Sequence, residues 1–310
     1  MKKTLIVTLV TMVAMATPLT TAATNTATVA LGSTAHFITL AGAGITFSGS
    51  SNSTTINGDI GTYPTTTITG LGNVLLNGVN HAGDAITQTG KVDLVTAYND
   101  AVGRPADVTY PAAADLGGLT LTPGVHRDSS SFAITGTLTL DAQGNPDAVW
   151  IFQVGSTLIT ASASVVSLTN GAQARNVFWQ VGSSATLGTY SIFRGSILAL
   201  TDITMTTGSM IEGRTLARNG AVTFDQQIGS LPLPEAPRFT KIYKTLPDSM
   251  TVVLDTTPYF LLTLEACPDL LLTNWAFIAS DTPTETSWTN TDFTATSAVT
   301  QRFYRATLTP

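Results

Sequence analysis

Threonine and serine hydroxyl groups recur in a regular pattern between residues 151 and 225 of this chain of 310 residues. The segment 151–156 (IFQVGS) returns as residues 178–183 (FWQVGS), and looser echoes follow at 197–200 and 215–218. Each of these apolar runs is trailed by small and hydroxyl-bearing residues. A hydroxyl group both donates and accepts hydrogen bonds, and branching at Cβ restricts threonine to few rotamers. The pattern predicts a flat, neutral array of fixed hydrogen-bonding groups.

Alternation within the trailing stretches indicates which hydroxyl groups face outward. The apolar residues are assigned inward: Leu158, Leu187, Met205 and Phe224. The outward positions then hold five threonines: Thr157, Thr186, Thr204, Thr206 and Thr223. Five residues at strand ends are assigned to the same surface: Thr160, Ser162, Thr189, Ser191 and Ser209. Strict alternation would turn Thr160 and Ser162 inward, so this interpretation assumes a bend there.

The charged residues of the repeat do not form a catalytic group in this interpretation. A glycosidase needs two carboxylates beside one bond, and other polysaccharide-cleaving enzymes need an acid or base placed beside the substrate. We find no pair at a shared strand offset among the charged residues of the repeat: Arg175, Arg194, Asp202, Glu212, Arg214, Arg218 and Asp225. We therefore expect no catalytic residue and no enzyme activity.

The other polar residues that could do chemistry are interpreted as structural. The three histidines, His36, His81 and His126, lack metal-ligand spacing, so no metal and no cofactor is expected. Asp59 and Asp84 each follow a glycine, in a turn and at a helix start, where capping of backbone N–H groups is the ordinary role. Residues 42–44 (GAG) are not a phosphate-binding loop, because neither a lysine nor a helix start follows them. Residues 129–131 (SSS) have no nearby histidine and acid that could activate a serine nucleophile, so we interpret them as a loop.

The repeat itself predicts the elements that must position these hydroxyl groups. We take Phe152, Trp179, Leu198 and Leu216 as equivalent positions, so the steps between them give the length of each coil. Fixed-period β repeats stack into coils, and these steps indicate about 18 to 19 residues per coil, with a loop at 167–175 in the first. The fold class is thus mainly β, a solenoid.

Further elements flank the repeat on its N-terminal side. Residues 30–80 and 119–140 contain short apolar and small-residue runs typical of strands. Between them the period becomes helical over 81–103, with a stripe of small and apolar residues: Ile86, Gly90, Leu94, Ala97, Tyr98 and Ala101. The side of the solenoid is the large apolar surface that this helix can cover, so we place the helix there.

Composition and processing signals limit the partners. Charged residues make up 11%, against about 25% in ordinary soluble domains. The net charge is −6 and no lysine occurs between Lys91 and Lys241, which excludes a basic stripe for nucleic acid.

Residues 1–23 are typical of an export signal, with Lys2 and Lys3 before an apolar run too short to span a membrane. We expect a secreted, extracellular protein with no membrane span, and its single cysteine, Cys267, leaves no internal disulfide.

A second unit is expected after the repeat. We predict a solenoid domain over 30–228, a proline-rich linker over 229–240 and a small β-sandwich over 241–310, where short strands recur at sandwich-like spacing. The markers of this last segment are residues 275–278 (WAFI) and 302–305 (RFYR). On these it loosely resembles fibronectin-like modules that end many exported bacterial proteins. The resemblance names no activity; a cell surface or a polysaccharide is the partner considered for it, and a monomer is expected.

Several long motifs, in order, resemble one family. They are residues 99–105 (NDAVGRP), 115–125 (DLGGLTLTPGV), 136–142 (GTLTLDA), 176–188 (NVFWQVGSSATLG) and 216–223 (LARNGAVT). Together they closely resemble the microbial type-1 ice-binding (DUF3494) family over residues 30–228. The resemblance implies a discontinuous right-handed β-helix of triangular section, with one long α-helix alongside, that adsorbs to ice as its partner.

The outward hydroxyl groups suit that implied ligand. Ice offers ordered water oxygens and no charge, and strands of successive coils lie about 4.7–4.9 Å apart, close to a short repeat of the ice lattice. The family often places Thr-Ala/Gly-x-Thr/Asn at the strand end. This chain has residues 160–163 (TASA), 189–192 (TYSI) and 207–210 (TGSM), so the fourth position is apolar each time and Tyr190 breaks the second. Ile159 is a further candidate for an outward position. The face is thus expected to be less regular than one of threonine alone.

Two other functions fit the same solenoid. It could be a secreted structural or adhesive spacer whose C-terminal sandwich holds a cell or polysaccharide, or a polysaccharide-active β-helix enzyme. Ice binding differs from both in one observation, because only an ice-binding protein coats a growing ice crystal when fluorescently labelled. Threonine is also common on exposed strands for purely structural reasons.

Overall fold

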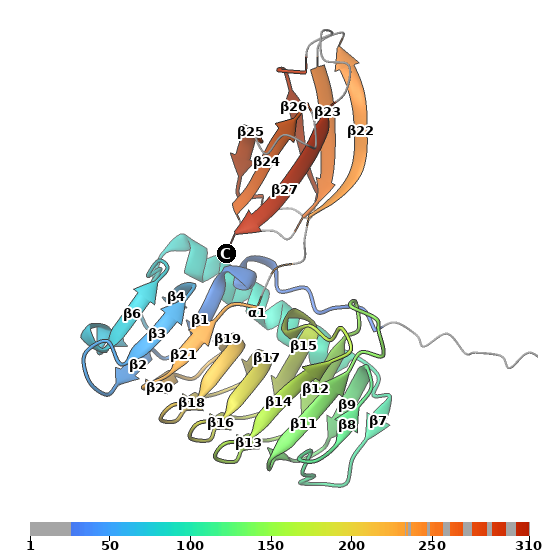
Figure 1. The fold of residues 1–310 in the computed structure, drawn as a ribbon. Helices are drawn as coiled ribbons and strands as arrows, with labels where there is room; N and C mark the ends of the chain where they lie inside the picture. The colour runs from blue at the N-terminus through green and yellow to red at the C-terminus, as the bar shows by residue number, and fades with distance from the viewer. Residues whose placement is uncertain are drawn as a thin grey trace, which may run out of the picture.

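A parallel β-solenoid and a pair of antiparallel sheets make up the structure, a computed structural model (Figure 1). It describes residues 26–232, 234, 237–246, 249–256, 261–268, 275–283, 287–295 and 302–309. The export signal predicted for residues 1–23 lies outside the described residues. Across the described helices, none is long and apolar enough to cross a membrane.

The first face of the solenoid is a 7-stranded parallel sheet, called the ladder sheet below. Its strands stack in the spatial order β10 (Phe132–Ile134), β13 (Leu158–Thr160), β16 (Ala185–Leu187), β18 (Ile203–Met205), β20 (Val222–Asp225), β2 (Ile45–Ser48) and β5 (Ile68–Thr69). The strands are only two to four residues long, so each coil contributes one short segment to this face.

The other two faces belong to one bent 14-stranded sheet. β17 (Ile192–Ala199) and β19 (Met210–Ala217) run across both, because their N-terminal and C-terminal halves pair with different neighbours. The second face holds β8 (Thr120–Leu121), β11 (Thr137–Asp141), β14 (Val165–Thr169), β21 (Ile228–Ser230), β3 (Thr54–Asn57) and β6 (Val74–Asn77). The third holds β7 (Val108–Thr109), β9 (Gly124–Asp128), β12 (Trp150–Val154), β15 (Val177–Val181), β1 (Phe37–Ala41) and β4 (Asp59–Thr62).

The stacking order is not the chain order. β1 and β2 pair in parallel with β19 and β20, so the N-terminal strands continue the stack beyond its last sequential coil. The three-faced, discontinuous solenoid implied by the resemblance is therefore confirmed. The discontinuity comes from this return of the N-terminal segment.

The coil length holds, with one correction to the predicted equivalences. Phe152 pairs with Trp179 as expected, but Trp179 pairs with Ile197 and not with Leu198, so that step is shorter by one position than predicted. The longer step occurs instead between Thr204 and Thr223. The loop predicted for 167–175 is also shorter, because residues 167–169 belong to β14 and the 3-10 helix η3 (Ala174–Asn176) occupies part of the remainder.

Stacked rings fill the interior. Phe152 and Trp179 lie 3.8 Å apart between ring centroids, with an interplanar angle of 8°. Phe132 meets Phe152 edge-on, and Phe193 packs against Trp179 at 5.1 Å. All four rings are fully buried, and burial of such large apolar groups is the main driving force for stacking the coils.

The helix α1 (Ala85–Gly103) covers the third face. Asp84 caps it by accepting a hydrogen bond from the Thr87 backbone N–H at 2.9 Å, as expected for an N-cap. The predicted stripe is buried with one exception: Ile86 is 45% exposed, because Thr87, the next residue in the first turn, is the one that faces the solenoid. The buried stripe packs on Phe37, Leu40, Ile151, Phe178, Leu198 and Leu216.

The C-terminal residues form two antiparallel three-stranded sheets. One has the order β22 (Arg238–Leu246), β23 (Ser249–Asp255) and β26 (Ser287–Asp292); the other has β25 (Ala276–Asp281), β24 (Leu261–Cys267) and β27 (Phe303–Thr309). Their shared core is separate from that of the solenoid: Val252, Leu254, Leu262, Leu264 and Trp288. Two sheets around one core are the arrangement expected for a sandwich.

Lys91 ties α1 to the solenoid and yields a prediction about pH. Its Nζ donates to the carbonyls of Ala217 at 2.7 Å and Arg218 at 2.6 Å. Burial, and secondarily the charge of Arg218, lower the pKa of Lys91 from 10.5 to about 8. The folded state therefore binds fewer protons than the unfolded state between these two values, and the free energy of unfolding should rise with pH across this window.

We expect Lys91→Met to remove this rise, which is on the order of 1–3 kcal/mol for wild type. Urea unfolding of both proteins at pH values below and within the window measures it. The difference between the two proteins isolates Lys91 from the tyrosines, such as Tyr110, whose raised pKa acts in the opposite direction at higher pH. Parallel pH profiles for the two proteins would show that Lys91 is not the cause.

Candidate functional site

Five threonines form a row across the outer side of the ladder sheet. Thr186 pairs with Thr204, Thr204 with Thr223, Thr223 with Thr46, and Thr46 with Thr69, so they occupy the same position in five consecutive coils. We call this row the threonine ladder. At about 4.8 Å between neighbouring strands, its ends lie roughly 19 Å apart.

Local sequence turns each ladder threonine outward. In four of the strands the threonine lies between two buried apolar residues, such as Ile203 and Met205 around Thr204. The other three sets are Ala185 with Leu187, Val222 with Phe224, and Ile45 with Phe47. Because side chains alternate along a strand, burying both neighbours fixes the hydroxyl and methyl groups at the surface. Thr186, Thr204, Thr223 and Thr46 are half-buried by adjacent strands, and Thr69 at the edge is exposed.

The ladder continues into apolar residues at its other end. Ile159 pairs with Thr186, and Ala133 pairs with Ile159. The Ile159 side chain is 51% exposed, so its outward position is as anticipated from the sequence. The outer row is therefore five threonines followed by isoleucine and alanine.

Hydroxyl groups beside the ladder bond to one another between coils. On the side where the strands begin, Ser131 and Thr157 lie 2.8 Å apart between oxygens, and Ser184 and Thr201 also 2.8 Å. On the side where the strands end, Ser162 and Thr189 are 2.7 Å apart. The Thr206 hydroxyl donates to the Leu187 carbonyl at 2.7 Å, and that of Thr207 to the Asp225 carboxylate at 2.5 Å. These bonds hold the polar groups in place before any ligand arrives.

Three of the ten residues assigned to this surface are buried, which corrects the prediction. Thr160, Ser191 and Ser209 are 4%, 1% and 0% exposed. The Thr160 hydroxyl accepts the Gly188 N–H at 2.9 Å inside the coil, so strict alternation holds at Thr160 and the assumed bend starts one residue later. The other two lie just after a residue with positive φ, Tyr190 (57°) or Gly208 (70°), and this corner turns the serine inward.

The remaining seven assigned residues reach the surface: Thr157, Ser162, Thr186, Thr189, Thr204, Thr206 and Thr223. The structure brings Thr186, Thr204 and Thr223 into the ladder and places the other four beside it. Sequence reasoning missed Thr46 and Thr69. The triplet 45–47 (ITF) does resemble 222–224 (VTF), but nothing local reveals that these strands are neighbours.

The ladder sheet carries almost no charge. Asp225 is the one ionisable residue within its strands, and Thr207 occupies one of its oxygens. A correction concerns the second face, where Arg194 and Glu212 do share a strand offset and form an ion pair of 3.2 Å. A single cation beside a single carboxylate is not the pair of acids that glycoside hydrolysis requires.

The histidines have structural surroundings. His81 lies between Asp84, at 2.6 Å from Nδ1, and Asp59, at 3.4 Å from Nε2. His126 is buried between the Tyr110 hydroxyl and the Thr122 carbonyl, and burial lowers its pKa. Burial likewise lowers the pKa of His36 to about 4. No group of three or more His, Cys, Asp or Glu within the described ranges could hold a metal ion.

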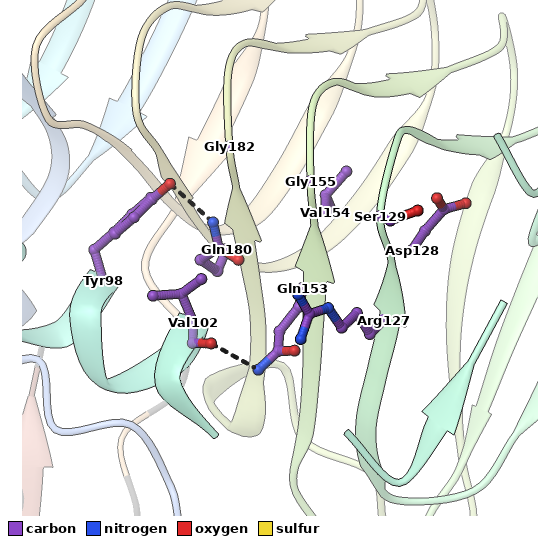
Figure 2. Close-up of a pocket in the computed structure, with 10 residues that line it drawn as sticks. All are labelled: Tyr98, Val102, Arg127, Asp128, Ser129, Gln153, Val154, Gly155, Gln180 and Gly182. Atoms are coloured by element: carbon purple, nitrogen blue, oxygen red, sulfur yellow. Dashed lines mark hydrogen bonds between the residues drawn. The ribbon is translucent and has the colours of Figure 1, made fainter. Parts of the chain in front are cut away.

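A hollow of about 290 Å³ lies beside the C-terminal end of α1, where β9, β12 and β15 end (Figure 2). Its polar groups mainly anchor the helix. Gln153 Nε2 donates to the carbonyls of Ala101 at 2.9 Å and Arg104 at 2.7 Å, and Gln180 Nε2 donates to the Tyr98 hydroxyl at 2.9 Å. The two Gln153 bonds satisfy carbonyls that a helix leaves free at its C-terminus. The hollow is therefore explained by the packing of α1.

Comparisons with known proteins agree on one family. A family model described as ice-binding-like matches residues 39–228. An ice-binding protein of Nostoc sp. (strain HG1) is 45% identical over 227 residues, covering 72% of this chain and 81% of the relative. One from Flavobacterium frigoris (strain PS1) is 37% identical over 218 residues, covering 65% and 76%.

Solved structures show the same likeness. The crystal structure of an ice-binding protein from an Antarctic biological consortium matches with a TM-score of 0.65 and 45% identity, over 68% of this chain and 94% of that one. One from the Antarctic ascomycete Antarctomyces psychrotrophicus gives 0.64 and 40%, over 67% and 100%. Because the family match ends at residue 228, the fibronectin-like character of the C-terminal sheets stays a prediction.

The inward position of Thr160 can be tested by stability. Thr160→Val keeps the shape but leaves the Gly188 N–H without its acceptor, so we expect the free energy of unfolding to fall by about 1–3 kcal/mol. Thr186→Val, the same change on the ladder, should alter it by no more than about 0.5 kcal/mol. Urea denaturation compares the two variants. Equal effects would contradict the assignment of Thr160 to the interior.

Proposed function

This chain belongs to the ice-binding-like family, and from that membership and the threonine ladder we propose that it adsorbs to ice through the outer side of the ladder sheet. The observation that carries the proposal is the register of Thr186, Thr204, Thr223, Thr46 and Thr69, one per coil with no interruption. The proposed ice-binding surface comprises the ladder and the hydroxyl groups beside it.

The physical reason lies in what ice presents. An ice crystal has no net charge and no pocket, so recognition depends on holding water, or water-like groups, at lattice spacing. Backbone hydrogen bonding sets the ladder repeat at about 4.8 Å. Each threonine hydroxyl can form a hydrogen bond with a water molecule, and the methyl group of the same side chain orders the neighbouring water molecules. Because branching at Cβ and packing between strands fix the side chains beforehand, little conformational entropy is lost on adsorption.

The near-absence of charge supports the same surface. An ionised side chain keeps its own hydration shell, which would compete with lattice water. Among the strands of the ladder sheet only Asp225 is ionisable, and it accepts a hydrogen bond from Thr207. Ile159 and Ala133 extend the row with apolar contact where the threonines stop.

The proposed activity follows from adsorption. A protein fixed to the crystal blocks further growth between attachment points, which depresses the freezing point relative to the melting point and slows recrystallisation. We propose that the protein acts outside the cell, on the basis of the export-type sequence at residues 1–23. We propose a monomer as the acting form. The proposal assigns it no enzymatic role.

Enlarging one ladder residue should abolish ice binding without unfolding the protein. Thr204→Tyr at the centre of the row would lift the surface off the lattice, so inhibition of ice growth should fall sharply. The free energy of unfolding should change by no more than about 0.5 kcal/mol, as for other surface substitutions, so the melting temperature should hardly move. The measurement is the freezing-point depression together with the coating of an ice crystal by labelled protein.

The matched control is Thr139→Tyr in β11, which makes the same change on the second face. It should leave ice binding intact. Equal loss from both variants, or no loss from either, would refute the ladder sheet as the binding surface. Labelled wild type that fails to coat ice would instead favour the structural or adhesive interpretation.

The C-terminal sheets should be dispensable for adsorption. A chain that ends after Pro232 keeps β21 and Leu231, which packs on the solenoid core, and removes a unit whose core is separate. We expect it to coat ice as the full chain does, with the circular dichroism of a folded solenoid. Loss of ice binding by a folded truncated chain would place part of the site in the C-terminal sheets.

A further inference from the structure

The corners that follow β13, β16 and β18 share one backbone shape, and the corner after β20 is one residue shorter, because Phe224 pairs with Met205 but Ile228 pairs with Met210. One residue has positive φ in each: Ala163 (56°), Tyr190 (57°), Gly208 (70°) and Gln226 (57°). The residue after it points into the corner and is buried: Ser164, Ser191, Ser209 and Gln227. The N–H of each serine donates to the carbonyl three residues earlier, at 3.1–3.2 Å. The three serines thus occupy the same turn, and Gln227 follows them in the stack because Ile228 pairs with Met210.

Consecutive members of this column carry polar atoms without a partner. Among the described residues, Ser191 Oγ, Ser209 Oγ and Gln227 Oε1 are buried and form no hydrogen bond with the protein. Such groups are costly in an interior, and a buried water molecule commonly satisfies them. Three in register, in adjacent coils of one corner, indicate a shared cause.

Gln227 shows what this corner can accommodate. Its Nε2 reaches back to the preceding coil and donates to the carbonyl of Thr206 at 3.1 Å and to that of Met205. One coil earlier the residue at this place in the stack is Ser209, and the counterparts of Met205 and Thr206 are Leu187 and Gly188. Serine is shorter than glutamine by a methylene and an amide group. The Ser209 side chain therefore cannot reach these carbonyls as the glutamine amide does, and its Oγ is left without a protein partner.

We propose that this corner holds a file of buried water molecules. One water lies between Ser209 Oγ and the Gly188 carbonyl, and the next lies between Ser191 Oγ and the Ala161 carbonyl. Both carbonyls accept one backbone N–H within their turn, which leaves a second lone pair for the water. In the last coil of the repeat, the Gln227 amide takes the place of the water.

The spacing of the coils suits such a file. Equivalent serine oxygens in adjacent coils lie about 4.8 Å apart, too far for a direct hydrogen bond. A water about 2.8 Å from each can bridge them at a nearly tetrahedral angle, so each water gains three partners, two hydroxyls and a carbonyl. The file would fix the corner that borders the threonine ladder. The inference does not depend on ice binding.

A reciprocal exchange tests the file in the full chain. Ser209→Gln should replace one water with an amide, and Gln227→Ser should create one further site. Magnetic relaxation dispersion of water ¹⁷O counts long-lived internal waters, and we expect one fewer and one more, respectively, than in wild type. A high-resolution crystal structure should show ordered water within hydrogen-bond distance of Ser191 Oγ and Ser209 Oγ. Unchanged counts in both variants, or dry serines in the crystal, would overturn the proposal.

Stability provides a second measurement that does not require the larger side chain to fit. Ser209→Ala removes one partner of a bound water, so we expect the melting temperature to fall by about 2–4 °C. Ser167→Ala, on the outer side of β14, is the matched control and should leave it unchanged. If Ser209 had no water, removing its unpartnered hydroxyl would raise the melting temperature or leave it unchanged, and either result would refute the file.

Discussion

Parallel hydrogen bonding between successive coils is the constraint on which the other features depend. It sets one repeat distance for every row of side chains along the solenoid, whether the row is the aromatic stack inside, the threonine ladder outside or the serine column at the corner. Because Phe152 is stacked on Trp179 and Thr186 is aligned with Thr204 by the same backbone register, packing the interior also orders the surface. A shift of one residue would exchange the two sets.

The proposed binding surface is a consequence of stability. Ladder threonines are held outward because Ile203, Met205, Val222 and Phe224 are held inward, and the hydroxyl groups beside them bond between coils. The α-helix contributes indirectly, since it covers the third face and leaves the ladder sheet open to solvent. Rigid, neutral and periodic are the properties that recognition of a crystal of water requires, and each arises here from ordinary packing.

The corners after the ladder-sheet strands are completed in two ways. A glutamine supplies its own amide to the neighbouring carbonyls at Gln227, whereas Ser191 and Ser209 are too short to do so. A solenoid can thus vary the residues of a corner, and its length by one residue, and keep its strands stacked. The ladder beside it stays in register in either case.

Local sequence determined much of this protein. The coil length, α1, the neutral hydroxyl-rich character and the outward direction of Thr186, Thr204 and Thr223 all follow from alternation and periodicity, which act over a few residues. Tertiary structure decided the rest. Thr46 and Thr69 join the ladder only because β2 stacks on β20. These strands lie far apart in the chain, and nothing in the local sequence of either strand indicates that they pair. Ser191 and Ser209 turn inward because of a left-handed residue at each corner, where strand alternation no longer applies.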